Sequence, residues 1–412
     1  MVQLSKKNIV LCVTGGIACY KSVILASLLK KEGANVFVVM TKNATKFVNP
    51  VTFKNITKNK VTTKMFANDD FVPHISLADL ADLVIIAPAT ANIIAKASYG
   101  IADDMVSTLL VSSKAPKFII PAMNTNMYLN PITQENIQRL KKFDFKVLEP
   151  DTGMLACGVE GVGRFPEIEK IYGFILKNLG DRNSVFYNKK ILITLGGTVE
   201  DIDPVRCITN RSSGKMGFSF AEEFIIKGAN VKIICGNVSS LELHNFQKKF
   251  CDTEIQFVRS AKDMKEAVTQ NIDNFDLLFM ASAVADYSPE YSESKIKKEN
   301  DDLVLKLRKT EDILKSIPKK ENKIYVGFAA ESDNLIENAK NKLIKKQLDF
   351  VIANEIVGEQ AAIGNDKASV FILNKWNVDI KKIDYSQKSV IAKSVCNELE
   401  ELIKKNTPSL LK

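Results

Sequence analysis

Residues 6–17 read KKNIVLCVTGGI, and residues 189–198 read KKILITLGGT. Each stretch is a short run of apolar, largely β-branched residues that ends in a pair of glycines. Apolar runs without polar alternation are typical of parallel strands whose sheet is covered by helices on both faces. The glycine pair predicts a tight turn into a helix, which is the first step of a doubly wound α/β unit. The chain begins this pattern twice.

The two halves then continue on the same plan. A glycine and a second buried strand follow at 33–40, GANVFVVM, and at 228–235, GANVKIIC. A further apolar strand that ends in small residues comes at 82–92, DLVIIAPATAN, and at 276–286, DLLFMASAVAD. A duplication and the regularities common to α/β folds explain this repeat equally well.

These patterns predict an α/β fold with two doubly wound, Rossmann-like domains. We expect the domains to span residues 1–180 and 187–412, with the polar stretch NLGDRNSVFYN at 178–188 as the linker. Ligands of such domains bind beyond the carboxyl ends of the strands. Each domain is therefore expected to hold a site near its glycine pair and its small-residue strand end.

The composition is that of a globular protein with ordinary polarity. The 412 residues are 46% hydrophobic and 25% charged, which allows two or three domains with separate cores. No apolar run reaches the ~18 residues of a membrane span, and no signal peptide opens the chain. Seven cysteines without CxxC or zinc spacing indicate a reducing compartment, so we expect a cytoplasmic protein without a membrane partner. The net charge of +9 is dispersed and accompanies no nucleic-acid-binding motif, so no nucleic-acid partner is expected.

The glycine-containing turns match neither common phosphate-binding fingerprint. VTGGIACYKS and TLGGTVEDID both lack the third glycine of a dinucleotide site. The loop NRSSGKMG at 210–217 is not a P-loop, because Thr209 replaces the first glycine and Met216 replaces the hydroxyl residue after the lysine. A glycine pair still lets a ligand approach the backbone closely, with an anion at the helix N-terminus. A mononucleotide fits these turns better than NAD does.

Three residues of the first half are candidates for catalysis or substrate binding. His74, one of only two histidines, precedes the small-residue strand, although a structural role explains a lone histidine equally well. Asn124 ends the motif PAMN after a strand, where an amide can hold a carboxylate or carbonyl oxygen. Cys157 lies between Ala and Gly in the glycine-rich stretch 149–166, which has no periodicity and is predicted to be a lid.

The motifs TGGIACYKS, PHISLADLADLVIIAPATANIIAK, PAMN and TGMLACG together resemble the flavin-dependent cysteine decarboxylases, the phosphopantothenoylcysteine decarboxylases in particular. The resemblance implies a bound FMN and loss of CO2 from a cysteine moiety by way of a thioaldehyde and an enethiolate. It implies that His74 assists decarboxylation at the flavin, that Asn124 holds the substrate carboxylate and that Cys157 supplies the final proton. The cofactor-binding residues that we expect are Gly15, Gly16, Thr41 and Thr90.

The second half resembles the phosphopantothenate–cysteine ligases through DPVRCITNRSSGKMG, VADY and KIKK, in order across 190–373. Two such families fused in this order resemble the bacterial bifunctional family of coenzyme A biosynthesis. The resemblance implies that CTP and Mg2+ activate the carboxylate of 4'-phosphopantothenate as an acyl-cytidylate, with release of pyrophosphate. The amine of cysteine then attacks and releases CMP. The residues alone do not separate CTP from ATP.

By this resemblance, Lys295 favours formation of the acyl-cytidylate, and Asn210, with Arg206 nearby, serves its conversion to the amide. The spacer between Asp286 and Lys295 is slightly shorter than in the family, so Lys297 and Lys298 are alternatives to Lys295. Taken alone, each such lysine is explained equally well as a solvated charge. The nucleotide-binding residues that we expect are Met280, Ala281, Ser282, Asp286, Lys295, Glu311, Asp312, Ile313, Leu314, Phe328, Lys342 and Lys346. The metal ligands are not predicted.

The sequence departs from the ligase pattern at two places. TLGGT stands where TAGGT or TAGPT is usual, and IGNDKA at 363–368 keeps Gly364 and Asp366 but lacks the usual aromatic residue and asparagine. The sequence therefore does not define the role of the segment 363–368.

Two other functions are compatible with parts of the chain. A flavin-fold binding or regulatory protein with altered chemistry is opposed by the joint presence of His74, Asn124 and Cys157. An FMN prenyltransferase-like protein would have no use for a ligase half. The resemblance also implies a homo-oligomer, with trimers of the first domain and dimers of the second that together can form a dodecamer.

Overall fold

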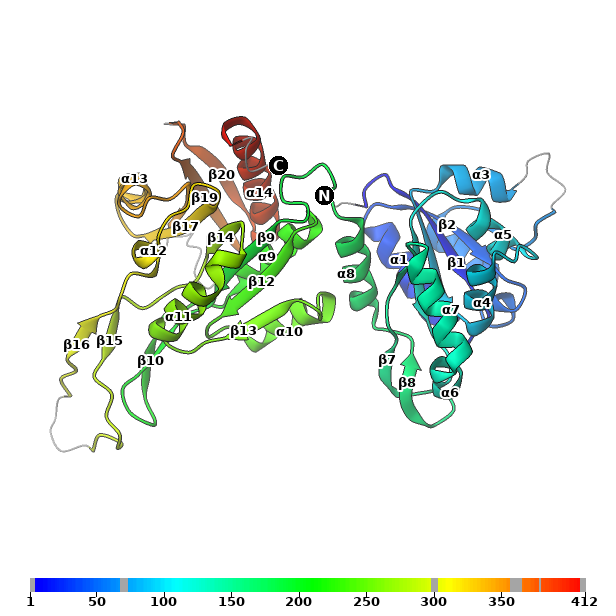
Figure 1. Cartoon of the computed structure of the whole chain (residues 1–412), viewed down its shortest axis with the longest axis horizontal. Helices are drawn as coiled ribbons and strands as arrows, with labels where there is room; N and C mark the ends of the chain where they lie inside the picture. The colour runs from blue at the N-terminus through cyan, green and yellow to red at the C-terminus, as the bar shows by residue number, and fades with distance from the viewer. Residues whose placement is uncertain (1–3, 67–72, 298–302, 356–364, 378, 408–412) are drawn as a thin grey trace. The chain divides into compact units, whose positions relative to one another are not determined.

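The computed structural model describes residues 4–66, 73–297, 303–355, 365–377 and 379–407. The chain divides into two compact units between Asn178 and Leu179. Each unit is built around one large sheet, with helices on both of its faces (Figure 1). Within the described residues, no helix is long and apolar enough to cross a membrane.

The first unit contains a six-stranded parallel sheet in the order β3-β2-β1-β4-β5-β6. All seven residues of its central strand β4 are buried, as expected for a strand that is covered on both faces. The strands are β1 (Asn8–Val13), β2 (Asn35–Met40), β3 (Val61–Thr62), β4 (Leu83–Ala89), β5 (Lys117–Pro121) and β6 (Lys146–Val147).

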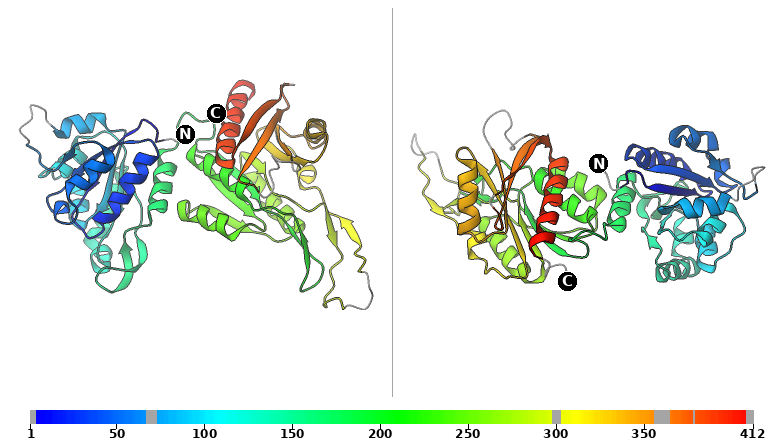
Figure 2. Two further views of the ribbon diagram at one scale, coloured as in Figure 1. Left: turned by 180° about the vertical axis from the view of Figure 1, so that it is seen from behind. Right: turned by 90° about the horizontal axis from the view of Figure 1, so that it is seen from above.

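Two sets of helices cover this sheet from opposite sides, as the view from above in Figure 2 shows. One set packs Ile93, Leu109 and Leu140 against Val10 and Ile86 of the central strands. This set is α3 (Pro73–Leu80), α4 (Ala91–Tyr99), α5 (Met105–Ser112) and α7 (Pro131–Lys142). On the other side lie α1 (Cys19–Lys31) and α2 (Pro50–Thr57), and the unit also contains η1 (Ala44–Lys46), α6 (Thr125–Leu129) and α8 (Ile168–Leu179).

The glycine-rich stretch 149–166 differs from the aperiodic lid that we predicted. It forms an antiparallel hairpin of β7 (Asp151–Met154) and β8 (Glu160–Arg164), in which Thr152 pairs with Val162 and Gly153 with Gly161. Its glycines hid the strand pattern, because they interrupt the side-chain alternation from which strands are predicted.

The second unit contains an eight-stranded sheet in the order β13-β12-β9-β14-β17-β18-β19-β20. The first strand of this unit, β9, pairs with β12 and β14, as β1 pairs with β2 and β4 in the first unit. The last two strands are antiparallel, which the sequence pattern did not predict. The strands are β9 (Lys190–Leu195), β12 (Asn230–Cys235), β13 (Glu254–Phe257), β14 (Leu277–Met280), β17 (Ile324–Glu331), β18 (Phe350–Glu355), β19 (Lys367–Asn374) and β20 (Lys381–Gln387).

Helices also cover both faces of the second sheet. On one face, Met264 and Leu335 pack against Leu278 of β14. On the other face, the rings of Phe220 and Phe224 pack on that of Phe279, with centroids 4.5 and 5.3 Å away. The helices are α9 (Lys215–Ile226), α10 (Ser240–Lys249), α11 (Ala261–Asn271), η2 (Ile272–Asn274), α12 (Ile313–Ser316), α13 (Leu335–Lys345) and α14 (Lys388–Asn406).

Two small antiparallel ribbons project from this unit (Figure 1). They are β10 (Val199–Asp201) with β11 (Cys207–Thr209), and β15 (Tyr287–Pro289) with β16 (Leu307–Lys309).

The end of the predicted linker is packed rather than free. Val185 and Phe186 are buried, and the ring of Phe186 lies 5.0 Å from that of Phe224. The backbone N–H of Val185 also donates to Glu400 at 3.2 Å. These contacts make residues 185 and 186 part of the second unit, although they fall within the polar stretch 178–188 that we took as linker.

Candidate functional sites

In the first unit, the four expected cofactor residues lie at the carboxyl ends of three neighbouring strands. Gly15 and Gly16 follow β1, Thr41 follows β2, and Thr90 follows β4. A Cβ atom on Gly16 would lie 3.7 Å from the methyl group of Thr90, and a Cβ on Gly15 would overlap Asn43. The helices α1 and α4 start beside this edge, and neither N-terminus is capped by a side chain. The first backbone N–H groups of α4 are therefore available to an anion, whereas at α1 Cys19 and Lys21 donate theirs to nearby carbonyls.

Asn124 and Cys157 meet at the adjoining strand end. The backbone N–H of Ala122 donates to the carbonyl of Ala89 at 3.1 Å, which places the end of β5 beside the end of β4. Asn124 caps α6 with its side-chain oxygen, which accepts from the N–H of Asn126 at 2.9 Å. Its amide nitrogen then donates to the sulfur of Cys157 at 3.6 Å. Both residues are exposed, so a ligand can reach the pair.

Two glycines of β8 allow the hairpin to pack closely on this corner. A Cβ on Gly163, whose φ is 126°, would overlap the carbonyl oxygen of Met123, and a Cβ on Gly161 would overlap the hydroxyl of Thr125. The N–H of Met123 also donates to the carbonyl of Gly163 at 3.0 Å. The glycines of this segment thus serve to place Cys157 beside Asn124.

His74 is the second residue of α3 and makes no described interaction with Asn124 or Cys157. Its Nδ1 is buried and finds no hydrogen-bond partner among the described residues, and the same is true of the hydroxyl of Thr125. Burying a polar atom without a partner costs about 1–3 kcal/mol, so each such atom is a candidate for contact with a ligand.

In the second unit, the loop 210–217 approaches the small-residue end of β14. The side-chain amide of Asn210 donates to the carbonyl of Ala283 at 3.0 Å. The hydroxyls of Thr194 and Ser282 lie 2.7 Å apart across β9 and β14. Helix α9 starts at Lys215 directly after Gly214, whose φ is 77°, and the hydroxyl of Ser213 accepts from the N–H of Lys215 at 3.4 Å. The loop therefore brings Asn210 and the start of α9 to the strand ends that carry Thr194 and Ser282.

The expected nucleotide-binding residues come from or flank four elements of this unit, β14, β17, α12 and α13. Met280 ends β14, Phe328 lies in β17, and Lys342 lies in α13. Lys342 donates to the carbonyl of Phe328, and burial lowers the pKa of this lysine to about 8. Lys346 pairs with Asp312 at 2.9 Å; burial opposes ionisation of this carboxyl, but the ion pair keeps its pKa below the ordinary value. Lys342 also feels the charge of Asp286, which follows Met280 at the strand end.

The remaining residues of the expected nucleotide site lie beside these four elements. Ala281 donates its N–H to the carbonyl of Thr194 at 3.0 Å. Glu311 pairs with Lys265 at 2.5 Å. Ile313 and Leu314 are buried in α12. Lys295, by contrast, makes no hydrogen bond or ion pair with another described residue.

Arg206 contacts the segment that carries Lys295. Its guanidinium pairs with Asp203 at 2.5 Å and donates to the carbonyl of Ile296 at 3.0 Å. The pairing with Arg206 holds the pKa of Asp203 well below its usual range. Sequence reasoning selected Arg206 and missed Asp203, whose position next to a proline in DPVR was the available signal. Lys298, one alternative to Lys295, lies outside the described residues.

The segment 363–368, which departs from the ligase pattern, forms an ion pair with the end of the loop 210–217. Asp366 pairs with Lys215 at 2.5 Å, and Glu242 lies 3.4 Å from the same ammonium. Gly364 lies outside the described residues. Asp366 therefore has a contact at the candidate site, which the altered motif did not define.

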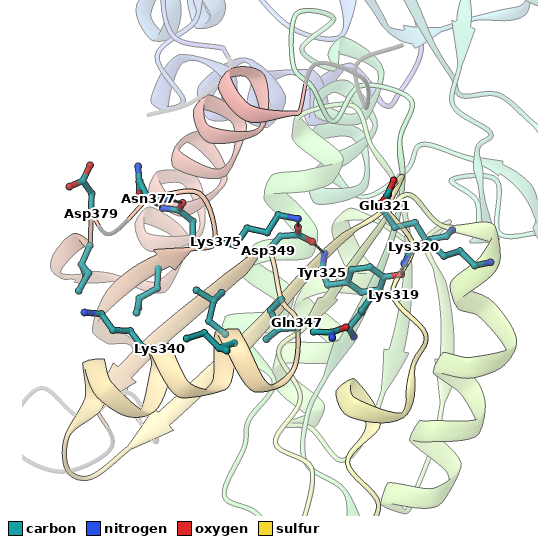
Figure 3. A pocket seen from close by; sticks show the side chains of 17 residues that line it. Lys319, Lys320, Glu321, Tyr325, Lys340, Gln347, Asp349, Lys375, Asn377 and Asp379 are labelled. Carbon is teal, nitrogen blue, oxygen red and sulfur yellow. Dashed lines mark hydrogen bonds and ion pairs between the residues drawn. The ribbon is translucent and has the colours of Figure 1, made fainter.

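A cavity of about 550 Å³ lies at the opposite ends of the strands (Figure 3). Tyr325 at the start of β17 and Asp349 before β18 line it, and none of the expected site residues does. Asp349 is already paired with Lys375 at 2.6 Å. Since ligands of doubly wound sheets bind at the carboxyl ends, this cavity is not the candidate site. Within the described ranges, no group of three or more acidic, histidine or cysteine side chains is arranged to hold a metal ion.

Two doubly wound units, each with amide, hydroxyl and glycine groups at the carboxyl ends of its strands, define a two-domain α/β protein of Rossmann-like type, with a candidate site in each unit. Known families match both units. The family described as flavoprotein matches residues 2–180, and the family described as DNA/pantothenate metabolism flavoprotein C-terminal domain matches residues 186–403.

Whole-chain relatives match nearly the full length. The coenzyme A biosynthesis bifunctional protein CoaBC of Bacillus subtilis is 42% identical over 90% of this chain and 92% of its own. That of Borreliella burgdorferi is 42% identical over 94% of this chain and 98% of its own. A solved structure of the C-terminal domain of such a protein is 32% identical, covers 54% of this chain and 100% of its own, and gives a TM-score of 0.44. The chain belongs to the family of coenzyme A biosynthesis bifunctional proteins.

Proposed function

We propose that this chain carries out two successive steps of coenzyme A biosynthesis. The second unit ligates cysteine to 4'-phosphopantothenate with CTP, and the first unit decarboxylates the resulting 4'-phosphopantothenoylcysteine to 4'-phosphopantetheine. The observation that carries the proposal is the 3.6 Å contact between the Asn124 amide and the Cys157 sulfur at a strand-end site, in a chain of the bifunctional family.

FMN fits the residues at the first site. The uncapped N-terminus of α4 suits its phosphate, and Gly15 and Gly16 let a flat group approach the backbone. Thr41 and Thr90 flank this edge, and the unpartnered Nδ1 of His74 is available to the cofactor or substrate. When bound, FMN accepts two electrons from the cysteinyl group and later returns them.

The side chains at this site then act on the substrate. Because the oxygen of Asn124 is held by the N–H of Asn126, its amide nitrogen faces outward as a donor. That nitrogen holds the substrate carboxylate until CO2 leaves. Cys157, beside it, donates a proton to the carbon chain during the final reduction.

The ligase step takes place at the second site, where backbone N–H groups and lysines face the nucleotide. The N–H groups at the start of α9 suit a phosphate, and Asn210 lies beside the Ala283 carbonyl at the strand end. The ammonium groups of Lys342, Lys346 and Lys295 offset the triphosphate charge as pyrophosphate leaves. Met280, Ala281, Ser282 and Asp286 line the nucleotide, together with Glu311 to Leu314 and Phe328.

We propose that Mg2+ enters this site bound to the triphosphate. Magnesium is usually held by substrate phosphates with one or two carboxylates rather than by an all-protein cage. Asp286 supplies a carboxylate at the right strand end.

The assembly proposed is a homo-oligomer with trimers of the first unit and dimers of the second. The projecting ribbon of β15 and β16 supports a contact in the second unit, because Tyr287, Tyr291, Leu303, Val304 and Leu307 are exposed along it. All seven cysteines are free, which supports a place in the reducing cytoplasm.

Separate assays test the two halves of the proposal. Purified protein should show the absorbance of oxidised flavin and release FMN on denaturation. It should also release pyrophosphate from CTP, Mg2+ and 4'-phosphopantothenate, and more slowly when ATP replaces CTP. Protein without flavin that gains none when FMN is added would contradict the first half, and equal rates with ATP would contradict the choice of nucleotide.

A further inference from the structure

Asp203 is a buried carboxylate in the loop between β10 and β11. Its side chain is 0% exposed, and both of its oxygens accept hydrogen bonds from the backbone or from Arg206. One oxygen accepts from the N–H groups of Val205 and Arg206 at 2.8 and 2.9 Å. The other accepts from Nε and Nη2 of Arg206 at 3.0 and 2.5 Å. A buried charge with this many partners fixes the loop in one conformation.

The side chains of Asp203 and Arg206 also bind the backbone of a residue far along the chain, Ile296. The N–H of Ile296 donates to Asp203 at 3.2 Å, and the carbonyl of Ile296 accepts from Arg206 at 3.0 Å. Both backbone hydrogen-bonding groups of Ile296 are thus held by one ion pair. A second tie lies nearby, where the N–H of Ser292 donates to the carbonyl of Ile202 at 2.9 Å.

Ile296 is the residue between the two lysines of the KIKK motif that the structure describes. Lys295 and Lys297 are exposed, and neither makes a hydrogen bond or ion pair with another described residue. A lysine side chain loses rotamer entropy when it is fixed, and a mobile backbone beneath it would add to the entropic cost of placing its charge. Because Ile296 is anchored, the backbone on either side of it is already ordered and adds little entropic cost when the lysine charges are placed.

We propose that Asp203 is a positioning residue of the ligase site: with Arg206 it holds the backbone of Ile296 and thereby places the ammonium groups of Lys295 and Lys297 for reaction at the triphosphate. This inference rests on the proposed ligase function. It gives Arg206 a defined task, which is to hold the lysine segment. It also links residues 295–297 to Asn210, since the loop with Asp203 and Arg206 lies at one end of β11 and Asn210 at the other.

Asp203→Asn tests this role, with Asp201→Asn as its matched control. Asp201 lies on the same ribbon and forms a comparable two-bond pair with Arg259, at 2.8 and 2.6 Å, but does not contact Ile296. In the full chain, we expect Asp203→Asn to lower kcat for pyrophosphate release by about 10- to 100-fold, with the KM for CTP within about twofold of wild type. Asp201→Asn should leave both within about twofold. Arg206→Lys, which keeps the charge but loses the second donor, should reproduce the fall in kcat.

Hydrogen exchange at Ile296 separates positioning from a general loss of structure. Asp203→Asn should speed exchange in the peptide that contains Ile296, while peptides of β9 and β14 exchange as in wild type; faster exchange throughout the unit would overturn a specific role. Wild-type kcat or wild-type exchange at Ile296 in Asp203→Asn would also overturn the proposal. Lys295→Gln and Lys297→Gln distinguish a failure of the proposed lysine role from a failure of the positioning role of Asp203. If both leave pyrophosphate release intact, the lysine role in the proposed function fails and this inference fails with it. If Lys295→Gln abolishes release while Asp203→Asn does not, only this inference fails.

Discussion

The side-chain amide of Asn124 donates to the thiol sulfur of Cys157 across 3.6 Å, although the two residues are 33 positions apart in the chain. Asn124 is fixed as the N-cap of α6, and Cys157 lies in the turn of the β7–β8 hairpin. In the proposed reaction, the carboxylate to be held and the carbon to be protonated belong to the same cysteinyl group. Two side chains that act on them must lie this close together.

Cys157→Ser should separate CO2 release from formation of the final thiol. The serine hydroxyl is a much weaker acid than the thiol, so protonation of the enethiolate should slow by about 100-fold or more, while decarboxylation continues. The measurement is CO2 and 4'-phosphopantetheine from the same reaction of 4'-phosphopantothenoylcysteine. Cys251→Ser is the control, because Cys251 is also exposed and free but lies in the second unit. Normal formation of 4'-phosphopantetheine by Cys157→Ser would remove the role assigned to the thiol.

Gly163→Ala should displace the hairpin from Asn124. The new methyl group would overlap the Met123 carbonyl, and this overpacking should lower the free energy of unfolding of the first unit by about 1–3 kcal/mol. Decarboxylation should fall with it, as thermal unfolding and CO2 release together would show.

Gly158→Ala is the matched control for that change. Its φ of 79° is also left-handed, but a Cβ there would meet nothing within 4 Å. It should therefore cost only about 1–2 kcal/mol of backbone strain and leave decarboxylation near wild type. Equal loss of CO2 release in both variants would show that the Met123 contact does not place Cys157.

Lys295→Gln should abolish pyrophosphate release from CTP and 4'-phosphopantothenate. Its ammonium has no partner among the described residues, so removing the charge should cost about 10²-fold or more in rate and little in stability. Lys297→Gln, two positions further on, is the comparison variant. Undiminished release by Lys295→Gln together with loss in Lys297→Gln would transfer the role to Lys297.

CTP affinity should fall as the pH rises through about 8. Burial lowers the pKa of Lys342 to about 8 in the free protein, so its ammonium is charged below that pH and becomes neutral above it. Bound triphosphate favours the charged form, so binding weakens by up to tenfold for each pH unit above 8 until the complex also loses the proton. Calorimetric titration with Mg2+ and CTP between pH 7 and 10 measures this.

Lys342→Arg provides the control for that pH dependence, because a guanidinium stays charged over the whole range. Its CTP affinity should be flat between pH 7 and 10 once the contribution of other groups is subtracted. A wild-type inflection that persists in Lys342→Arg would assign the titration to another group.

The central strands of both sheets could be predicted, because buried parallel strands leave long apolar runs in the sequence. The matched runs at β1 and β9 occupy the same place in their sheets, and the small residues after β4 and β14 lie at the ligand edge. The edge strand β20 follows no such pattern, since four of its seven residues are exposed and polar or charged. Its antiparallel pairing with β19 is set by tertiary contacts that a local pattern does not reveal.

The sequence identified many of the candidate site residues, but it did not reveal the contacts between them. The motifs pointed to Asn124, Cys157, Asn210 and Arg206. The role of Asp203 depends on a hydrogen bond to Ile296, 93 positions away, which no local spacing encodes. The hairpin that carries Cys157 was likewise hidden, because its glycines meet residues 123–125 rather than forming a regular strand pattern.

One reaction tests the central claim, which is that a single chain joins ligation to decarboxylation. The full-length protein, loaded with FMN, is given 4'-phosphopantothenate, cysteine labelled at its carboxyl carbon, CTP and Mg2+. We predict pyrophosphate, CMP, labelled CO2 and 4'-phosphopantetheine in equal amounts, and no CO2 when CTP is left out. Release of CO2 without CTP, or pyrophosphate release in saturating cysteine that is never followed by labelled CO2, would contradict the account.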